Sequence, residues 1–203
     1  MGTMSPFAFS ISLAAVINGL GIVGLLSTFA AVIDRVDKTD DVQYWVYQLL
    51  VAMQFLFHIL LFWSMWDIML ALENFNFLTY LYFLLGPILL YLSTQLLLPK
   101  LNNEQPLDLR NRYYYVAPRY FTVMSLLWLW SISFWPFLVG VWAPDTPLTI
   151  SALVICLILR FSKRAWVHET LLLAYFGVFV LAVVIYSLEL GGIGNLIREA
   201  LDG

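Results

Sequence analysis

Histidine is the residue type in this sequence best suited to proton or ligand chemistry, and the chain contains two. His58 lies in an apolar stretch, and Gln54, four residues earlier, shares its face if that stretch is helical. An imidazole held there can bind a substrate or exchange a proton, because it titrates near neutrality. It can equally be a hydrogen-bonding partner that joins two helices, and the sequence leaves both interpretations open.

Polar or helix-breaking residues recur at the predicted depth of His58 in three other apolar stretches. Asn18 lies near the middle of the first stretch and Ser131 near the middle of the fourth. The third is interrupted by Gly86 and by Pro87, which has no N–H to continue the helical hydrogen bonding. Polar side chains and a broken helix at the bilayer midplane are typical of transporter sites. The predicted midplane cluster comprises Asn18, Gln54, His58, Gly86, Pro87 and Ser131.

The second histidine belongs to a group of charged residues near the end of a different apolar stretch. This predicted cytoplasmic-end charge cluster is either an ion-pair network at the membrane interface or a gate that accepts protons. His168 and Glu169 are adjacent, so they point about 100° apart on a helix and do not chelate a metal ion. The members of the cluster are Arg160, Arg164, His168 and Glu169.

The predicted depths of the two histidines disfavour a haem held between them. Measured from the same membrane surface, His58 lies about 21 Å along its helix and His168 only about 5 Å along its own. Both axial ligands of a haem must reach one iron, so a bis-histidine haem is not expected. A cofactor held by His58 and some other ligand remains open, and the cofactor is otherwise unknown.

The rest of the sequence offers little support for an enzyme. The run 19–24 matches the G-x-G-x-x-G of dinucleotide-binding loops, but it lies inside an apolar stretch and not after a strand. We find no zinc-type spacing, no phosphate-binding glycine loop and no Ser/His/Asp set at a shared depth. The formal net charge of −3 excludes a broad basic surface, so nucleic acid is not an expected partner.

The composition places these residues in an all-α integral membrane protein with a single transmembrane domain, 1–203. Of the 203 residues, 62% are hydrophobic and 11% are charged, whereas about a quarter of the residues in soluble domains are charged. A helix needs about 20 apolar residues to cross the hydrocarbon core. Five stretches meet that length, and a sixth, 148–161, spans if the basic residues after it snorkel. The predicted helices are 7–33, 44–72, 77–98, 119–142, 148–161 and 165–188.

The basic residues predict how six such helices are oriented. Nine of the ten Lys and Arg residues lie in or next to the first, third and fifth connections, at 34–43, 99–118 and 160–165. The positive-inside rule makes these connections cytoplasmic, which gives three hairpins with both termini outside the inner membrane. If 148–161 were re-entrant, the C-terminal helix would break this pattern, so six spans are predicted.

The predicted outer side carries acidic residues in place of basic ones. These carboxylates either attract cations toward a pore mouth or are simply the complement of the basic inner side. They are Asp67, Glu73, Asp145 and Glu189. Within the bilayer, the tripeptide Leu-Ser-Thr occurs at 26–28 and again at 92–94, either as the trace of a repeat or by chance.

Three functions remain compatible with the sequence. The first is a small transporter or channel-like protein that uses the midplane cluster. The second is a non-catalytic accessory or scaffold subunit of a larger membrane complex. The third is a membrane enzyme or redox carrier for a quinone-like or lipid-like substrate. The lipid bilayer is the expected surrounding in each case, and six helices are few for a complete pathway, which favours a homo-oligomer or a larger complex.

Overall fold

The computed structural model describes residues 6–33, 42–71, 76–99, 108–189 and 191–202, and all its regular elements are helices. Five of them are long and apolar enough to cross a membrane. The chain is therefore a multi-pass, all-helical membrane protein. The long helices are α1 (Pro6–Ile33), α2 (Trp45–Ala71), α3 (Phe77–Leu97), α4 (Leu109–Val139) and α6 (Ala165–Ala182), the last continued by η1 (Val183–Ser187).

The sixth predicted helix is present but shorter than the others. α5 (Thr146–Phe161) has 16 residues and so reaches about 24 Å, less than the ~30 Å of a typical hydrocarbon core. It begins with Pro147 in its first turn, where a proline N–H is not needed, and Arg160 lies in its last turn. For the six predicted spans, the described residues form five long helices and one short one, and the count of six spans stays a prediction.

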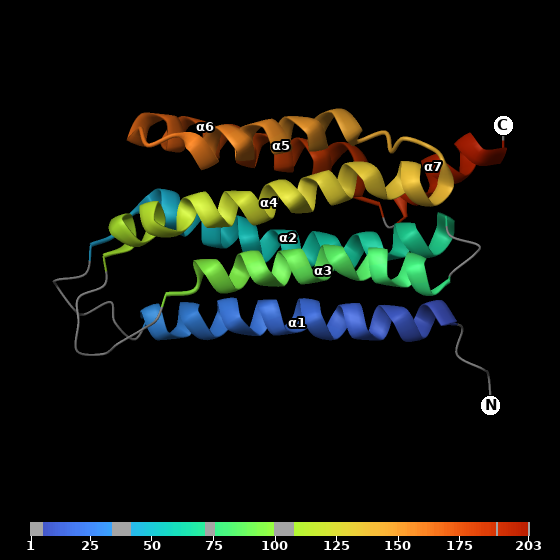
Figure 1. The fold of residues 1–203 in the computed structure, drawn as a ribbon, viewed down its shortest axis with the longest axis horizontal. Helices are drawn as coiled ribbons and strands as arrows, with labels where there is room; N and C mark the ends of the chain where they lie inside the picture. Colours follow the sequence, from blue (N-terminus) through green and yellow to red (C-terminus); the bar gives the residue numbers. More distant parts are fainter. Residues whose placement is uncertain (1–5, 34–41, 72–75, 100–107, 190, 203) are drawn as a thin grey trace.

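The helices lie side by side along a common direction, with the start of α1 and the C-terminal helix toward the same end (Figure 1). α4 is central, because it packs against α3 on one side and α5 on the other. α1 packs against α2 and α3, and α6 packs against α5 and α2. The connections at 34–41 and 100–107, which we predict to be cytoplasmic, lie outside the described residues.

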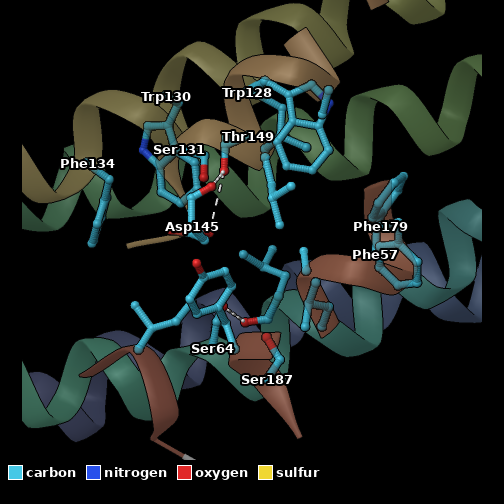
Figure 2. Close-up of a pocket in the computed structure, with 18 of the residues that line it drawn as sticks. Phe57, Ser64, Trp128, Trp130, Ser131, Phe134, Asp145, Thr149, Phe179 and Ser187 are labelled. Atoms are coloured by element: carbon cyan, nitrogen blue, oxygen red, sulfur yellow. Dashed lines mark hydrogen bonds between the residues drawn. The ribbon is translucent and has the colours of Figure 1, made fainter. Parts of the chain in front are cut away.

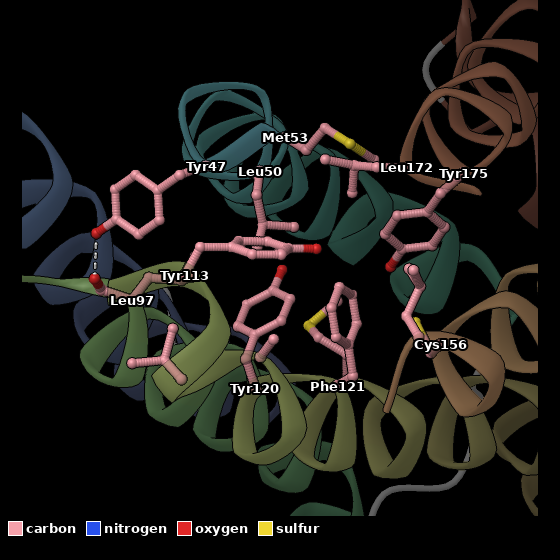
Figure 3. Packing of buried hydrophobic residues seen from close by; sticks show 14 of the residues in the cluster. Tyr47, Leu50, Met53, Leu97, Tyr113, Tyr120, Phe121, Cys156, Leu172 and Tyr175 are labelled. Atoms are coloured by element: carbon pink, nitrogen blue, oxygen red, sulfur yellow. Dashed lines mark hydrogen bonds between the residues drawn. The ribbon is translucent and has the colours of Figure 1, made fainter. Parts of the chain in front are cut away.

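The core between α2, α4 and α6 is rich in tyrosine (Figure 3). Tyr113, Tyr120 and Tyr175 are each at most 1% exposed, and each hydroxyl has a hydrogen-bond partner from another helix. A buried tyrosine contributes a large apolar ring but needs a partner for its hydroxyl. The core therefore fixes the helices by directional bonds as well as by apolar packing.

The sequence-based start of the fourth helix is wrong by ten residues. The sequence predicts that Pro118 ends the connection 99–118, directly before a helix over 119–142. In the structure α4 begins at Leu109 and continues through Pro118. Asp108 caps its first turn by accepting a hydrogen bond of 2.9 Å from the Asn111 N–H. Burial of Tyr113 and its neighbours outweighs the bond that Pro118 cannot make.

The C-terminal part of the chain also differs from the prediction. The helix predicted over 165–188 changes to a π-helical turn, η1, at Val183. A further helix, α7 (Gly192–Asp202), follows and packs against the end of α2. The N–H of Gly194 donates a hydrogen bond of 2.9 Å to the Asp67 carboxylate, and Ile197 is buried against the bundle. α7 is thus an amphipathic helix that lies across one end of the bundle.

Candidate functional site

His58 is the centre of a hydrogen-bonded network between three helices. Its Nδ1 atom lies 2.6 Å from Oδ1 of Asn18 in α1, and its Nε2 atom lies 2.7 Å from the hydroxyl of Thr94 in α3. The Asn18 amide also donates a bond of 2.9 Å to the main-chain carbonyl of His58. Asn18 and His58, which we predict at the same depth, are thus hydrogen-bonded to each other, and this contact ties α2 to α1.

Gln54 extends this network by one turn of α2. Its amide lies 2.7 Å from the Ser93 hydroxyl and 2.8 Å from that of Thr94. Its carbonyl oxygen accepts a bond of 2.8 Å from the Tyr120 hydroxyl in α4. The His58 network, at most 2% exposed throughout, therefore joins four helices through Asn18, Gln54, His58, Ser93, Thr94 and Tyr120.

The His58 network is complete with a neutral imidazole. Because the Asn18 nitrogen donates to a carbonyl, its oxygen faces Nδ1, which must carry the ring proton. Nε2 then accepts from the Thr94 hydroxyl. Gly21 of α1 lies so close that a methyl group there would overlap the ring. Both ring nitrogens have hydrogen-bond partners and Gly21 packs directly on the ring, which favours the structural interpretation of His58.

The other predicted midplane residues do not join the His58 network. Gly86 lies against the indole of Trp130 in α4, where a side chain would overlap the ring. The indole N–H of Trp130 donates a hydrogen bond of 2.8 Å to the Tyr82 carbonyl. Pro87 is buried within α3 next to this contact. Ser131 lines a separate cavity. The close approach of α3 and α4 explains Gly86 without a ligand.

His168 is buried, whereas the charged residues predicted to cluster with it are exposed or half-buried. His168 is 1% exposed, with Nδ1 2.8 Å from the Tyr113 hydroxyl and Nε2 3.1 Å from the Ser162 carbonyl. A carbonyl only accepts, so Nε2 carries the proton and Nδ1 accepts from Tyr113. This buried pair holds the start of α6 against α4 and the end of α5.

The rest of the predicted charge cluster faces outward. Arg164 is exposed, Glu169 is half-buried, and Arg160 lies 4.9 Å from the ring centre of Phe161. Within the described part of the chain, no ion pair joins Arg160, Arg164, His168 and Glu169, so the structure gives no support to the first of the two interpretations, an ion-pair network. Snorkelling of arginines over apolar surface is typical of a membrane interface.

A cavity of about 160 Å³ lies between α2, α4, α5 and α6, and the His58 network does not line it (Figure 2). Its walls are largely aromatic. The Phe57 ring packs edge-to-face on Trp128, with centroids 5.6 Å apart, and on Phe179, at 5.1 Å. The Trp128 indole N–H donates a bond of 2.8 Å to the Tyr175 hydroxyl, which fixes both rings. The cavity is thus a shaped, apolar space inside the bundle.

Carboxylates lie on this cavity as well as aromatic rings. Asp67 from α2 and Asp145 from the start of α5 both line it. Asp67 is 5% exposed and accepts the Gly194 N–H. The side chain of Asp145 has its own main-chain N–H and the Thr149 hydroxyl, at 3.5 Å, as donors. Burial raises the pKa of the Asp145 carboxyl, its hydrogen bonds lower it, and the nearby Asp67 carboxylate raises it further.

Hydroxyl groups complete the polar part of the cavity. Figure 2 shows Ser131 and Thr149 beside Asp145 on one side of the space, and Ser64 and Ser187 on the other. Ser187 belongs to η1, and π-helical turns are frequent at functional sites. No basic side chain is among the described residues that line the cavity.

Sequence reasoning missed several of the residues that build these two regions. Ser93 and Thr94 belong to the recurring Leu-Ser-Thr tripeptide, which marked them without revealing their bonds to Gln54. Asp67 and Asp145 appeared only as members of the acidic outer side. Their shared cavity depends on how α2, α4, α5 and α6 pack together, which periodicity along one helix does not show.

Comparisons with known proteins do not classify the chain further. No family model, curated protein or solved structure matches it. Among the described residues, no three His, Cys, Asp or Glu side chains lie close enough together to hold a metal ion. The argument for function therefore depends on the geometry of the chain itself.

Proposed function

We propose that the chain is a small transporter-like membrane protein whose ligand site is the aromatic cavity between α2, α4, α5 and α6. One observation carries the proposal: the helix bundle contains a partly open, aromatic-lined cavity of about 160 Å³ with two carboxylates among its lining residues. Ligand sites are concave, mostly apolar and supplied with a few polar groups that fix orientation. The His58 network lacks such a space, so it holds the bundle together and does not bind the ligand.

The proposed topology has six spans in three hairpins, with both termini outside the inner membrane. The 9-to-1 division of basic residues supports this orientation. Asp67 and Asp145 would then lie toward the outer side, and the cavity would be reached from there. α7 would lie at the outer surface, because its amphipathic sequence suits the membrane interface.

Binding of three matched probes tests the cavity. We would measure the affinity of purified protein for 2-phenylethylammonium, 2-phenylethanol and phenylacetate by titration calorimetry, since an apolar cavity of about 150 Å³ accommodates a benzene ring. We expect at least one probe to bind, and Ala152→Leu to abolish binding, because Ala152 lines the cavity. The probe that binds should then accumulate in vesicles that contain the protein.

A matched variant separates filling of the cavity from general damage. Ala117 is buried to the same extent as Ala152 but does not line the cavity. Ala117→Leu must therefore overpack the core and lower the melting temperature, whereas Ala152→Leu fills existing space and is tolerated. Failure of all three probes to bind, together with purification alongside a fixed partner protein, would favour the accessory-subunit interpretation instead.

A further inference from the structure

The two carboxylates of the cavity lack a counter-charge within the described residues. Asp67 is buried, and its hydrogen-bond donors are the main-chain N–H groups of Gly194 and Ile193. Asp145 has its own main-chain N–H and a long approach of 3.5 Å from the Thr149 hydroxyl. Buried carboxylates are stable when paired with a cation or several donors, and each of these has fewer donors than a carboxylate can accept. The site therefore has unused capacity for positive charge.

The walls of the same cavity suit a cation as well. The faces of Trp, Tyr and Phe rings attract ammonium groups, and the attraction is stronger where water is excluded. Trp128 and Tyr175 are held by their mutual hydrogen bond, and Phe57 packs against both. Fixed rings cost little conformational entropy when a ligand binds. The cavity thus offers preformed aromatic surfaces close to buried negative charge.

We propose that the cavity binds an organic cation, namely a protonated amine or a quaternary ammonium whose apolar part is about the size of one aromatic ring. The inference rests on the proposed function, because it names the ligand class of the same site. The apolar part lies among the aromatic side chains, and the ammonium group lies between Asp67 and Asp145. An anion of the same shape meets like charge there, and a neutral molecule leaves the carboxylates unpaired.

Two neighbouring features fit this arrangement. The carboxyl of Asp145 has a raised pKa because it is buried and because Asp67 is near. A bound cation offsets both effects, because it favours the ionised carboxylate. The π-helical turn η1 contributes Tyr186 and Ser187 to the cavity, next to the acidic residues. The hydroxyl of Ser187 gives an ammonium N–H a neutral acceptor in addition to the two carboxylates.

The three phenyl probes also test this inference, because they differ mainly in charge. We expect 2-phenylethylammonium to bind about tenfold more tightly than 2-phenylethanol, and phenylacetate to bind more weakly than both. Asp145→Asn should remove the preference for the cation and leave the affinity for the alcohol unchanged. Asp67→Asn should do the same, since asparagine keeps an oxygen for the Gly194 N–H.

Glu199→Gln is the matched control. Glu199 is an exposed residue of α7, so its loss removes one negative charge from the same end of the molecule without touching the cavity. The preference for the cation should persist in this variant. Equal binding of cation and alcohol by the unaltered protein would overturn the inference and leave the proposed function standing. Absence of binding by every probe would overturn both.

Discussion

At the scale of residues, His58 shows how a buried titratable group can be fully used by the fold. Each ring nitrogen has a partner, and the partners come from two other helices. Inside a low-dielectric bundle, a satisfied network is rigid, and removal of one member leaves the others unpaired. The contribution of His58 is therefore expected to appear in stability measurements and to be absent from ligand affinity.

Replacement of Gly21 by alanine tests this role of His58. The added methyl group overlaps the His58 ring, so it must displace either the imidazole or α1. We expect Gly21→Ala to lower the free energy of unfolding by about 1–3 kcal/mol, the usual cost of overpacking. Gly19→Ala is the control, because nothing lies within 4 Å of a methyl group at that position. Equal melting temperatures of the two variants would contradict the tight packing of His58.

Asp145 makes both stability and cation binding depend on pH. Its pKa in the folded protein is raised above the ordinary 3.8, so the folded state holds the proton more strongly than the unfolded state. Asp145 therefore stabilises the ligand-free protein below pH 3.8, and this contribution is lost as the pH rises through the raised pKa. A bound cation needs the ionised carboxylate, so its affinity increases as the pH rises over the same range.

Titrations with Asp145→Asn separate this effect from that of other groups. The remaining ionisable side chains on the cavity are Asp67 of α2, Tyr175 of α6 and Tyr186 of η1. We would measure the melting temperature and the affinity for 2-phenylethylammonium between pH 3 and pH 8, a range set around the ordinary carboxyl pKa of 3.8. The variant should show weaker pH dependence in both. An unchanged pH profile would assign the titration to Asp67.

At the scale of elements, α7 and the π-helical turn η1 line the acidic end of the cavity. Ile193 of α7 lines the cavity, and the N–H of Gly194 is bonded to Asp67. A methyl group at Gly194 would overlap the backbone of Asp67, so only glycine lets α7 pack this closely on α2. The position of α7 is thus coupled to a carboxylate of the proposed site.

Gly194→Ala is expected to loosen the packing of α7 on α2. The substitution separates α7 from α2, so amide hydrogens of 193–201 should exchange faster and the dissociation rate of a bound cation should rise. Gly177→Ala in α6 is the control, because a methyl group there meets nothing within 4 Å. Slower dissociation from the Gly194 variant, or exchange equal to that of the control, would show that α7 does not cover the cavity.

How far the sequence predicted these elements depends on which forces determine them. Apolar length alone predicted the long helices to within a residue or two, except at α4 and at the end of α6. The start of α4 was predicted too late, because Pro118 by itself favours a helix boundary. The burial of Tyr113 against His168 outweighs this local propensity, and the helix continues through Pro118. α7 is short and its stability depends on Asp67, so its own sequence did not reveal it.

In the candidate sites, too, the sequence predicted the features that depend on one helix and missed those that depend on contacts between helices. The polar face of α2 was visible from helical spacing, and it correctly placed Gln54 and His58 together. Their partners Thr94 and Tyr120 come from other helices, and spacing within one helix carries no information about them. The cavity is a property of how four helices pack, so no single stretch of sequence encodes it.

At the scale of the whole molecule, the function proposed here requires that α5 crosses the membrane. If α5 spans, its two ends face opposite sides, and Asp145 and Thr149, which line the cavity, lie at the outer end of α5. If α5 is re-entrant, both its ends face one side of the membrane. With 16 residues, α5 is short enough that thinning of the bilayer or snorkelling of Arg160 must accompany a span.

Labelling of single cysteines with a membrane-impermeant maleimide decides between these topologies. Cys156 is the only cysteine and is fully buried, so the unaltered protein gives little background. Trp142 and Lys163 are exposed and flank α5, and Glu199 is exposed on α7. We expect Trp142→Cys and Glu199→Cys to react in intact cells, and Lys163→Cys to react only after the membrane is opened. Reaction of Trp142→Cys and Lys163→Cys from the same side would show that α5 does not span, and the six-span topology would then be wrong.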